Sequence, residues 1–264
     1  MSLKMNYLST HLPVEALAIR IQHLKEESEG VPVLLPIEGS DGTIQKYVPA
    51  SYGQEQMVAR WKMSPAMYNM PTTIVFHGTV DIESMKKAFL HLTQQQPSLR
   101  SVVRVDSVTN NLYQRVLGAD QAEECFELVV MDAKDDDDVR NIIQAESLYQ
   151  FDLMNPPVVR VVLVRLSCSH EYLLINQHHI GSDGWSRTIL RRQLLKLYLY
   201  FSGDDKDSDI LTIPIHPNYV DFTMWTRRWL FDYGQQERYE IFQMRILAKM
   251  HYLLKLLLLL LHLT

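Results

Sequence analysis

The sequence has few of the residues that mark disulfide-rich or nucleic-acid-binding proteins. Its 264 residues include two cysteines, Cys125 and Cys168, which is too few for a disulfide framework and fits a reducing compartment. Lys and Arg number 26 against 31 Asp and Glu, a formal net charge of -5, and no long basic block occurs. Phosphate binding relies on clustered positive charge. We therefore expect a cytoplasmic protein without nucleic acid among its partners.

Long apolar runs are also scarce. Residues 1–10 contain no uninterrupted apolar core and no small-residue cleavage pattern, so no signal peptide is predicted. Residues 252–263 are almost all leucine, but this run is shorter than the roughly 20 apolar residues that cross a bilayer. We therefore expect no membrane partner.

The composition and pattern predict a globular α/β protein. Hydrophobic residues make up 47% of the chain and charged residues 22%, as in proteins with a sizeable core. Strand-like and helix-like segments follow one another without strict alternation, which indicates an α/β sandwich with a mixed sheet flanked by helices. The expected strands are 72–80, 99–105, 112–117, 126–131, 158–164 and 172–176; the expected helices are 11–28, 51–63, 81–96, a helix from 135–138 onward, 184–201 and a last one from 219 onward.

Two of these segments carry further information. The strands 158–164 and 172–176 are almost continuously apolar, as strands covered on both faces are. Four consecutive aspartates, 135–138, suit the positive dipole end of a helix. Calcium binding is the alternative for that acidic run.

Residues 176–186, with the sequence NQHHIGSDGWS, combine features that catalysis can use. A buried strand ends, two histidines follow, and a helix begins at Asp183 and Gly184. A side chain at the end of a central strand is held rigidly beside a crevice, and a helix N-terminus offers N–H groups to a developing oxyanion. Glycine allows close approach to the backbone, and histidine exchanges protons near neutral pH.

Two other interpretations of this segment remain open. His178 and His179 could be structural strand-end residues with satisfied hydrogen bonds. A metal site could use His178, His179 and Asp183 as ligands. Adjacent residues on a strand point to opposite faces, so both histidines cannot easily bind one ion. We therefore expect no metal.

The same segment carries a family resemblance. Residues 178–184, HHIGSDG, match HHxxxDG, the signature of condensation domains of nonribosomal peptide synthetases and of the wider acyltransferase superfamily that includes chloramphenicol acetyltransferase. Five further segments resemble family motifs in the right order: SYGQEQM at 51–57, YNMP at 68–71, QQPSLRS at 95–101, FDL with Pro157 and Arg160 at 151–160, and YVDFTMW at 219–225. The matches depart from the motifs at Gly53, Gln56 and Gln95. The resemblance covers 49 to about 230.

This resemblance implies a chloramphenicol-acetyltransferase-like fold and amide bond formation between a carrier-bound thioester donor and an amine acceptor. His179 would act as general base toward the amine, or orient it and stabilise the tetrahedral intermediate. His178 would turn away and hold the loop. Asp183 would be structural and pair with an arginine, for which Arg100 is a candidate. Gly184 completes the site, and substrates would arrive on phosphopantetheine arms, with no cofactor bound directly.

The resemblance also implies a domain organisation. Residues 11–28 resemble the last helix of a carrier domain, 29–48 would be a linker, 49–238 the N-terminal lobe of a condensation domain, and 239–264 an aberrant Leu-rich tail or, alternatively, a genuine amphipathic helix. Condensation domains have a second lobe, whose motifs do not occur here, so we expect an inactive fragment. Carrier and adenylation domains would be its partners. The alternatives are a stand-alone thioester-dependent acyltransferase and a non-catalytic, carrier-binding lobe.

Overall fold

The computed structural model describes residues 47–166, 170–212 and 217–232. The chain divides into two compact units, one of residues 34–228 and one of residues 1–33 with 229–264. The fold described below belongs to the unit 34–228, and only its last helix continues past that boundary, to residue 232. The predictions for 11–28 and 239–264, and that for the linker up to residue 46, lie outside the described residues. Val48, placed at the end of the predicted linker, instead begins a short strand.

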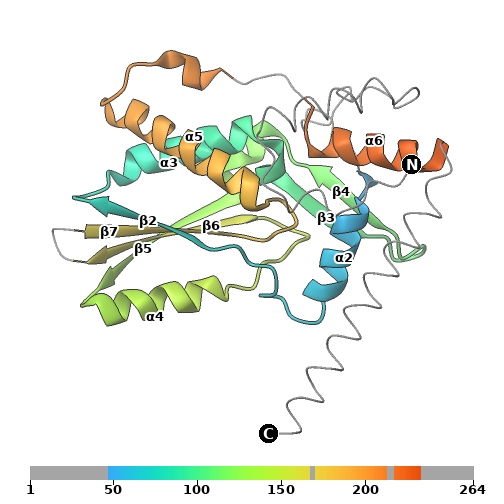
Figure 1. The fold of residues 1–264 in the computed structure, drawn as a ribbon, viewed down its shortest axis with the longest axis horizontal. Helices are drawn as coiled ribbons and strands as arrows, with labels where there is room; N and C mark the ends of the chain where they lie inside the picture. Colours follow the sequence, from blue (N-terminus) through green and yellow to red (C-terminus); the bar gives the residue numbers. More distant parts are fainter. Residues whose placement is uncertain (1–46, 167–169, 213–216, 233–264) are drawn as a thin grey trace, which may run out of the picture. The chain divides into compact units, whose positions relative to one another are not determined.

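A four-stranded mixed sheet forms the centre of this unit (Figure 1). Its order is β2 (Thr72–His77), β7 (His170–Gln177), β6 (Val159–Leu166) and β5 (Phe126–Ala133). β5 and β6 run parallel, whereas β6 with β7 and β2 with β7 are antiparallel. The mixed sheet and the inner position of the two most apolar strands confirm the sequence-based expectation.

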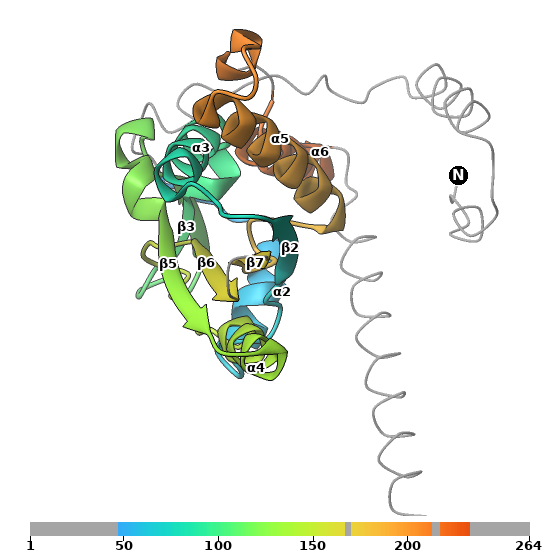
Figure 2. The ribbon, with the colours of Figure 1, turned by 90° about the vertical axis from the view of Figure 1, so that its left-hand side faces the viewer.

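Helices cover both faces of this sheet (Figures 1 and 2). α3 (Ile82–Gln95) and α5 (Gly184–Ser202) pack on one face, and α4 (Asp136–Ser147) packs on the other. Because successive strand residues point to opposite faces, β6 serves both layers. Val161 and Leu163 join the core under α3 and α5, whereas Val162 and Val164 join the core under α4.

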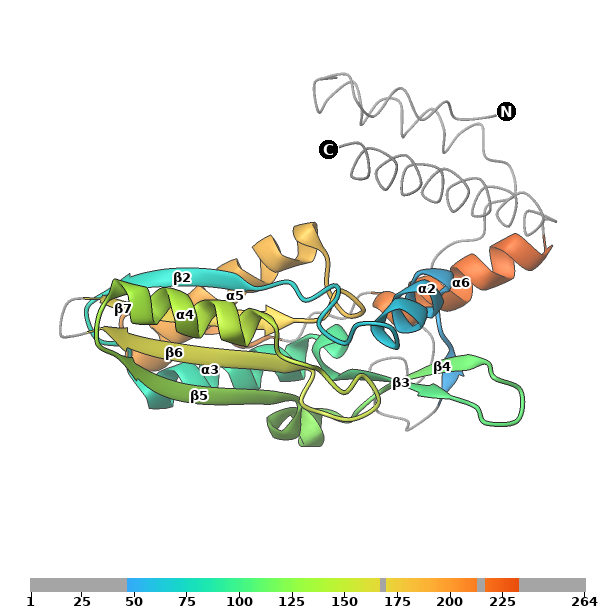
Figure 3. The same ribbon diagram turned by 90° about the horizontal axis from the view of Figure 1, so that it is seen from below.

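A smaller antiparallel sheet lies at one end of the unit (Figure 3). It consists of β1 (Val48–Pro49), β4 (Leu112–Val116) and β3 (Ser101–Val105), next to α2 (Tyr52–Trp61) and α6 (Tyr219–Asp232). Arg227 of α6 donates a hydrogen bond to the Ala50 carbonyl (2.6 Å) and pairs with Glu55 of α2. These contacts connect segments that lie about 170 residues apart in the sequence.

Two of the helices begin where the sequence predicts, each with an aspartate as N-cap. Asp81 caps α3, and Asp135 caps α4 by accepting a hydrogen bond from the Asp138 backbone N–H (2.8 Å). The expected strand 99–105 begins only at Ser101, because residues 97–100 form a 3-10 turn named η2 (Pro97–Arg100). Two further 3-10 turns are η3 (Ala119–Cys125) and η4 (Ser208–Leu211). None of the helices within the described ranges is long and apolar enough to cross a membrane.

Candidate active site

The histidine pair lies directly after an inner strand of the large sheet. β7 ends at Gln177, a bridge pairs His178 with Asn69, and α5 begins at Gly184. His178 is 3% exposed and His179 is half-buried. The structure therefore places His179 at the strand end that the sequence predicts, with part of its surface accessible.

His178 uses both ring nitrogens to hold the loop. Its Nε2 donates to the Met67 carbonyl (3.1 Å), and its Nδ1 accepts from the Ile180 N–H (3.1 Å). This pattern requires a neutral ring, since a protonated Nδ1 could no longer accept. Burial lowers the pKa of His178 to about 4, with a further lowering by His179 that the Met67 carbonyl opposes. His178 is therefore a neutral, fully bonded ring at neutral pH.

His179 has a different hydrogen-bond pattern. Its Nδ1 lies 2.6 Å from the Ser182 carbonyl oxygen. Because a carbonyl oxygen only accepts, Nδ1 carries the hydrogen, and the lone pair of the neutral ring is on Nε2. The His179 backbone N–H donates to the Tyr68 carbonyl (2.9 Å), and the Tyr68 ring lies edge-on at 6.0 Å. The loop thus fixes both the backbone and the tautomer of His179.

Asp183 starts α5, and it forms no ion pair with an arginine of the described residues. Its carboxylate accepts from the Ser186 N–H (2.7 Å), and the Ser186 hydroxyl accepts from the Asp183 N–H (2.7 Å). These bonds to Ser186 lower the pKa of Asp183. The structural role expected of Asp183 therefore has a local basis.

The expected partner, Arg100, is used elsewhere, so the Asp183–Arg100 pairing is wrong. The buried Arg100 guanidinium donates to carbonyl oxygens at the end of α3 and after β4, those of Thr93 (2.9 Å), Gln94 (3.3 Å) and Leu117. Carbonyls at a helix C-terminus lack partners within the helix. Arg100 satisfies them and therefore stabilises the junction between α3 and the small sheet.

Two glycines of the loop meet different surroundings. A Cβ atom added at Gly181 would lie 3.1 Å from the Ser98 carbonyl oxygen, whereas one added at Gly184 would meet nothing within 4 Å. The loop thus packs closely against η2 at Gly181, and a side chain there would require the Ser98 backbone to shift, a contact that the sequence pattern does not indicate. Gly184 and the neighbouring Trp185, which is 79% exposed, border open space at the helix start.

The polar groups at this corner do not suit a metal ion. Both nitrogens of His178 are occupied, Nδ1 of His179 is protonated, and the Asp183 carboxylate caps α5. Over the described ranges, no three His, Cys, Asp or Glu side chains are grouped so that they could hold a metal. A cavity of about 20 Å³ beside His178 has room for about one water. The loop of residues 178–184 therefore offers one basic nitrogen, Nε2 of His179, near the solvent-exposed start of α5.

Solved structures with this fold share little sequence with the chain. The X-domain from teicoplanin biosynthesis matches with a TM-score of 0.63 at 19% identity, over 78% of this chain and 42% of that one. The starter condensation domain of rhizomide synthetase RzmA matches with a TM-score of 0.54 at 16% identity, over 60% of this chain and 39% of that one. These likenesses show the fold, in agreement with the expected α/β sandwich.

Sequence comparisons show the family. A linear gramicidin synthase of Brevibacillus parabrevis is 30% identical over 235 residues, which is 85% of this chain. Malpibaldin synthetase of Mortierella alpina is 28% identical over 208 residues, or 75% of this chain. The chain spans 4% of the length of each of these relatives. A model of the condensation domain matches residues 44–243, and the chain therefore belongs to the condensation-domain family.

Proposed function

We propose that this chain supplies the histidine-bearing wall of an amide-forming site in nonribosomal peptide synthesis. The observation that carries the proposal is the bond from His179 Nδ1 to the Ser182 carbonyl (2.6 Å). It leaves Nε2 as the basic nitrogen of a half-buried ring. A general base requires a fixed, accessible lone pair of this kind.

The reaction uses His179 as a proton acceptor. The acceptor amine attacks the carbonyl carbon of the donor thioester, and Nε2 takes a proton from the amine nitrogen as the C–N bond forms. The tetrahedral intermediate collapses, the C–S bond breaks, and the proton held on Nε2 passes to the leaving thiolate, which gives the thiol and restores the neutral His179 ring. Open space beside Gly184 gives substrate room to approach the start of α5.

The partners follow from this chemistry. Both substrates would arrive as thioesters on phosphopantetheine arms of carrier domains, so the site binds no cofactor of its own. An adenylation domain would load those carriers within the same cytoplasmic assembly line. Support comes from the relatives, several of which are named as linear gramicidin synthases.

Enclosure of the site is the remaining requirement. The chain spans about two fifths of the solved domains it resembles, 42% of one and 39% of the other. The family resemblance implies a second lobe that forms the opposite wall of the substrate tunnel. Without that wall, water reaches the thioester and weakens the electrostatic contribution of the site. We therefore expect no detectable amide from the 264-residue chain alone.

A two-lobe enzyme tests the proposal. Residues 1–238 would be joined to the second lobe of a linear gramicidin synthase condensation domain, and amide formation from aminoacyl carriers would be followed by mass spectrometry. His179→Ala should lower the rate by about 10²-fold or more. The control is His77→Ala, since His77 is an exposed residue at the opposite end of the sheet.

Two results would contradict the proposal. If the two-lobe enzyme forms amide equally well with His179→Ala, then His179 is not the base. If the correctly folded two-lobe enzyme binds carriers but forms no amide, the non-catalytic, carrier-binding alternative holds.

A further inference from the structure

The backbone partner of His179 has a strained conformation. Tyr68, whose carbonyl accepts from the His179 N–H (2.9 Å), has a φ of 73°. Left-handed backbone is unfavourable for a tyrosine and persists only where the surrounding structure holds it. Strain of this kind gathers at functional sites. The question is therefore which groups hold Tyr68 in place beside His179.

Some of the restraint comes from groups next to Tyr68. The Met70 N–H donates to the Gln177 carbonyl (2.8 Å), which joins this segment to the end of β7. The Arg60 guanidinium hydrogen-bonds the Tyr68 hydroxyl and lies 5.6 Å from the centre of its ring. The Asn69 backbone N–H also donates to the Ala66 carbonyl (3.2 Å), within the same turn. These contacts restrain the ring and the backbone of the segment, and the Asn69 side chain adds a tie to a separate helix.

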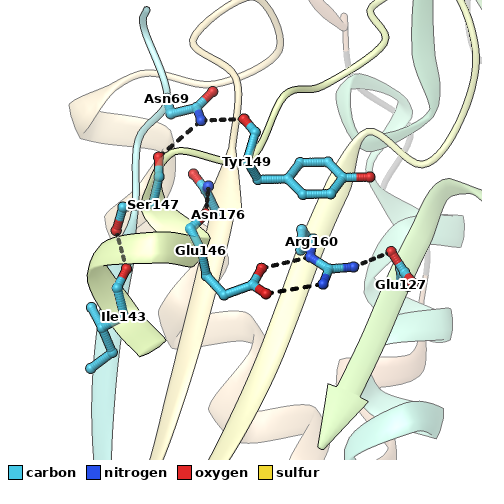
Figure 4. Close-up of polar contacts among 8 residues, drawn as sticks. All are labelled: Asn69, Glu127, Ile143, Glu146, Ser147, Tyr149, Arg160 and Asn176. Carbon is cyan, nitrogen blue, oxygen red and sulfur yellow. Dashed lines mark hydrogen bonds and ion pairs between the residues drawn. The ribbon is translucent and has the colours of Figure 1, made fainter. Parts of the chain in front are cut away.

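Asn69 ties that peptide to the end of α4 (Figure 4). Its Nδ2 donates to the Ser147 carbonyl (2.9 Å) and to the Tyr149 carbonyl (2.7 Å). Both are acceptors at the helix C-terminus, where carbonyls have no partner within the helix. The Asn69 Oδ1 is buried and has no hydrogen-bond partner among the described residues. The amide orientation is therefore settled, because a flipped amide would bring its oxygen against two carbonyls.

The end of α4 is itself fixed to the sheet. The Asn176 side chain of β7 donates to the Glu146 carbonyl (2.8 Å), and the Glu146 carboxylate accepts two hydrogen bonds from Arg160 of β6 (2.7 and 3.1 Å) (Figure 4). Arg160 and Glu146 side chains are each 13% exposed. Arg160 also pairs with Glu127 of β5 and lies 4.7 Å from the centre of the Tyr149 ring. The anchor that Asn69 uses is therefore held by β5, β6 and β7 together.

We propose that Asn69 is a positioning residue for His179: by fastening the peptide after the left-handed Tyr68 to the fixed end of α4, it sets the carbonyl that holds the His179 backbone. The importance of this role for catalysis rests on the function proposed above. The claim that Asn69 positions His179 does not depend on that function, because it concerns the geometry of the protein without substrate. Loss of the Asn69 amide should let Tyr68 relax out of the left-handed conformation, and the loop of His178 and His179 should shift with it.

Ring tautomers give a readout that stability alone does not change. In the full 264-residue chain labelled with ¹⁵N-histidine, long-range ¹⁵N–¹H spectra at pH 7.5 distinguish the two neutral tautomers. The wild-type chain should show His178 with its hydrogen on Nε2 and His179 with its hydrogen on Nδ1, as their carbonyl partners require.

Asn69→Ala should change this signature in a folded chain. The His179 signals should move to the averaged shifts of an imidazole that exchanges between tautomers, and the titration midpoint of His178, about 4 when its ring is buried, should rise by one pH unit or more. The matched control is Asn141→Ala, an exposed asparagine of α4, which should leave both rings unchanged. Asn69→Ser retains one donor and should give a smaller shift.

The outcomes separate positioning from a purely structural role. A folded Asn69→Ala chain with wild-type tautomers and titration, even at a lower melting temperature, would overturn the proposal. If neither Asn69→Ala nor Asn69→Ser folds, Asn69 serves the folding of the whole lobe and the positioning role is again refuted. Since the spectra measure no amide formation, their result is independent of whether His179 is the catalytic base.

Discussion

Acidification should destabilise this fold through His178. The ring is 3% exposed and both its nitrogens are bonded, and burial lowers its pKa from 6.5 to about 4. Between these values the unfolded chain binds a proton that the folded chain excludes. The stability that depends on the neutral His178 ring is therefore fully present well above pH 6.5, and this contribution decreases as the pH falls from 6.5 toward 4. At about 1.4 kcal/mol per pH unit, the loss is limited to about 3.5 kcal/mol and amounts to about 2 kcal/mol at pH 5.

Urea unfolding at pH 8 and pH 5 measures this effect. The Trp61 indole, which donates to the Phe151 carbonyl (2.9 Å), contributes to a fluorescence signal for the transition. Carboxylates and other histidines titrate over the same range, so the wild-type chain is compared with His178→Gln. This variant removes the titrating ring and retains an amide donor for the Met67 carbonyl.

The difference between the two chains isolates His178. The wild-type chain should lose about 2 kcal/mol more between pH 8 and pH 5 than His178→Gln does. Equal losses would show that the ring is protonated in the folded chain at pH 5, which would refute the neutral, doubly bonded state described above.

Two further predictions concern the loop around the histidines. Asp183→Ala should lower the free energy of unfolding, measured by urea titration, by about 1 kcal/mol because the cap at Ser186 is lost. Asp183→Asn should retain most of that stability because asparagine can also cap a helix. Equal losses in the two variants would contradict the capping role. Gly181→Ala should cost about 1–3 kcal/mol because its Cβ would meet the Ser98 carbonyl at 3.1 Å. Gly184→Ala should change stability by less than about 0.5 kcal/mol, and a thermal shift as large as that of Gly181→Ala would contradict the open space at Gly184.

The sequence predicted the strands of the large sheet well where an apolar run reflects burial of both strand faces. The runs 158–164 and 172–176 are apolar because both faces of β6 and β7 are covered, by α3 and α5 on one side and α4 on the other. The helix starts at 81 and 135 could be predicted because the interactions that begin a helix, such as an N-cap, act within three residues. In both cases the residues that determine the structure are close together in the sequence or follow a regular hydrophobic pattern.

The predictions failed where a side chain reaches backbone far away in the sequence. The strand expected from Leu99 starts two residues later because the turn before it brings Arg100 to carbonyls of α3 and of the segment after β4. The family resemblance suggested Arg100 as a candidate partner of Asp183, but the Asp183 carboxylate instead caps the adjacent helix. Charge complementarity suggests partners, but it does not account for the unpaired carbonyls that compete for an arginine.

In the candidate site, too, features set by neighbouring residues could be predicted, whereas those set by residues distant in the sequence could not. The motif at 178–184 identified the histidines, but nothing in the local pattern indicated that Tyr68 would be left-handed or that Gly181 would pack against Ser98. The YNMP segment at 68–71 is informative in the sequence only through its resemblance to a family motif. Its contacts run to residues about 80 and 110 positions away, so periodicity within the segment could not reveal them.

The two adjacent histidines differ in chemistry because a strand turns successive side chains to opposite sides. The first ring, His178, points into the interior of the protein, where its two nitrogens form hydrogen bonds with the Met67 carbonyl and the Ile180 N–H. It can gain a proton only by breaking a bond that holds the loop. The second ring, His179, meets one acceptor, the Ser182 carbonyl, and retains a lone pair on Nε2. Protonation of His179 at Nε2 leaves the bond to Ser182 intact, so in the reaction proposed above His179, and not His178, would take up the proton.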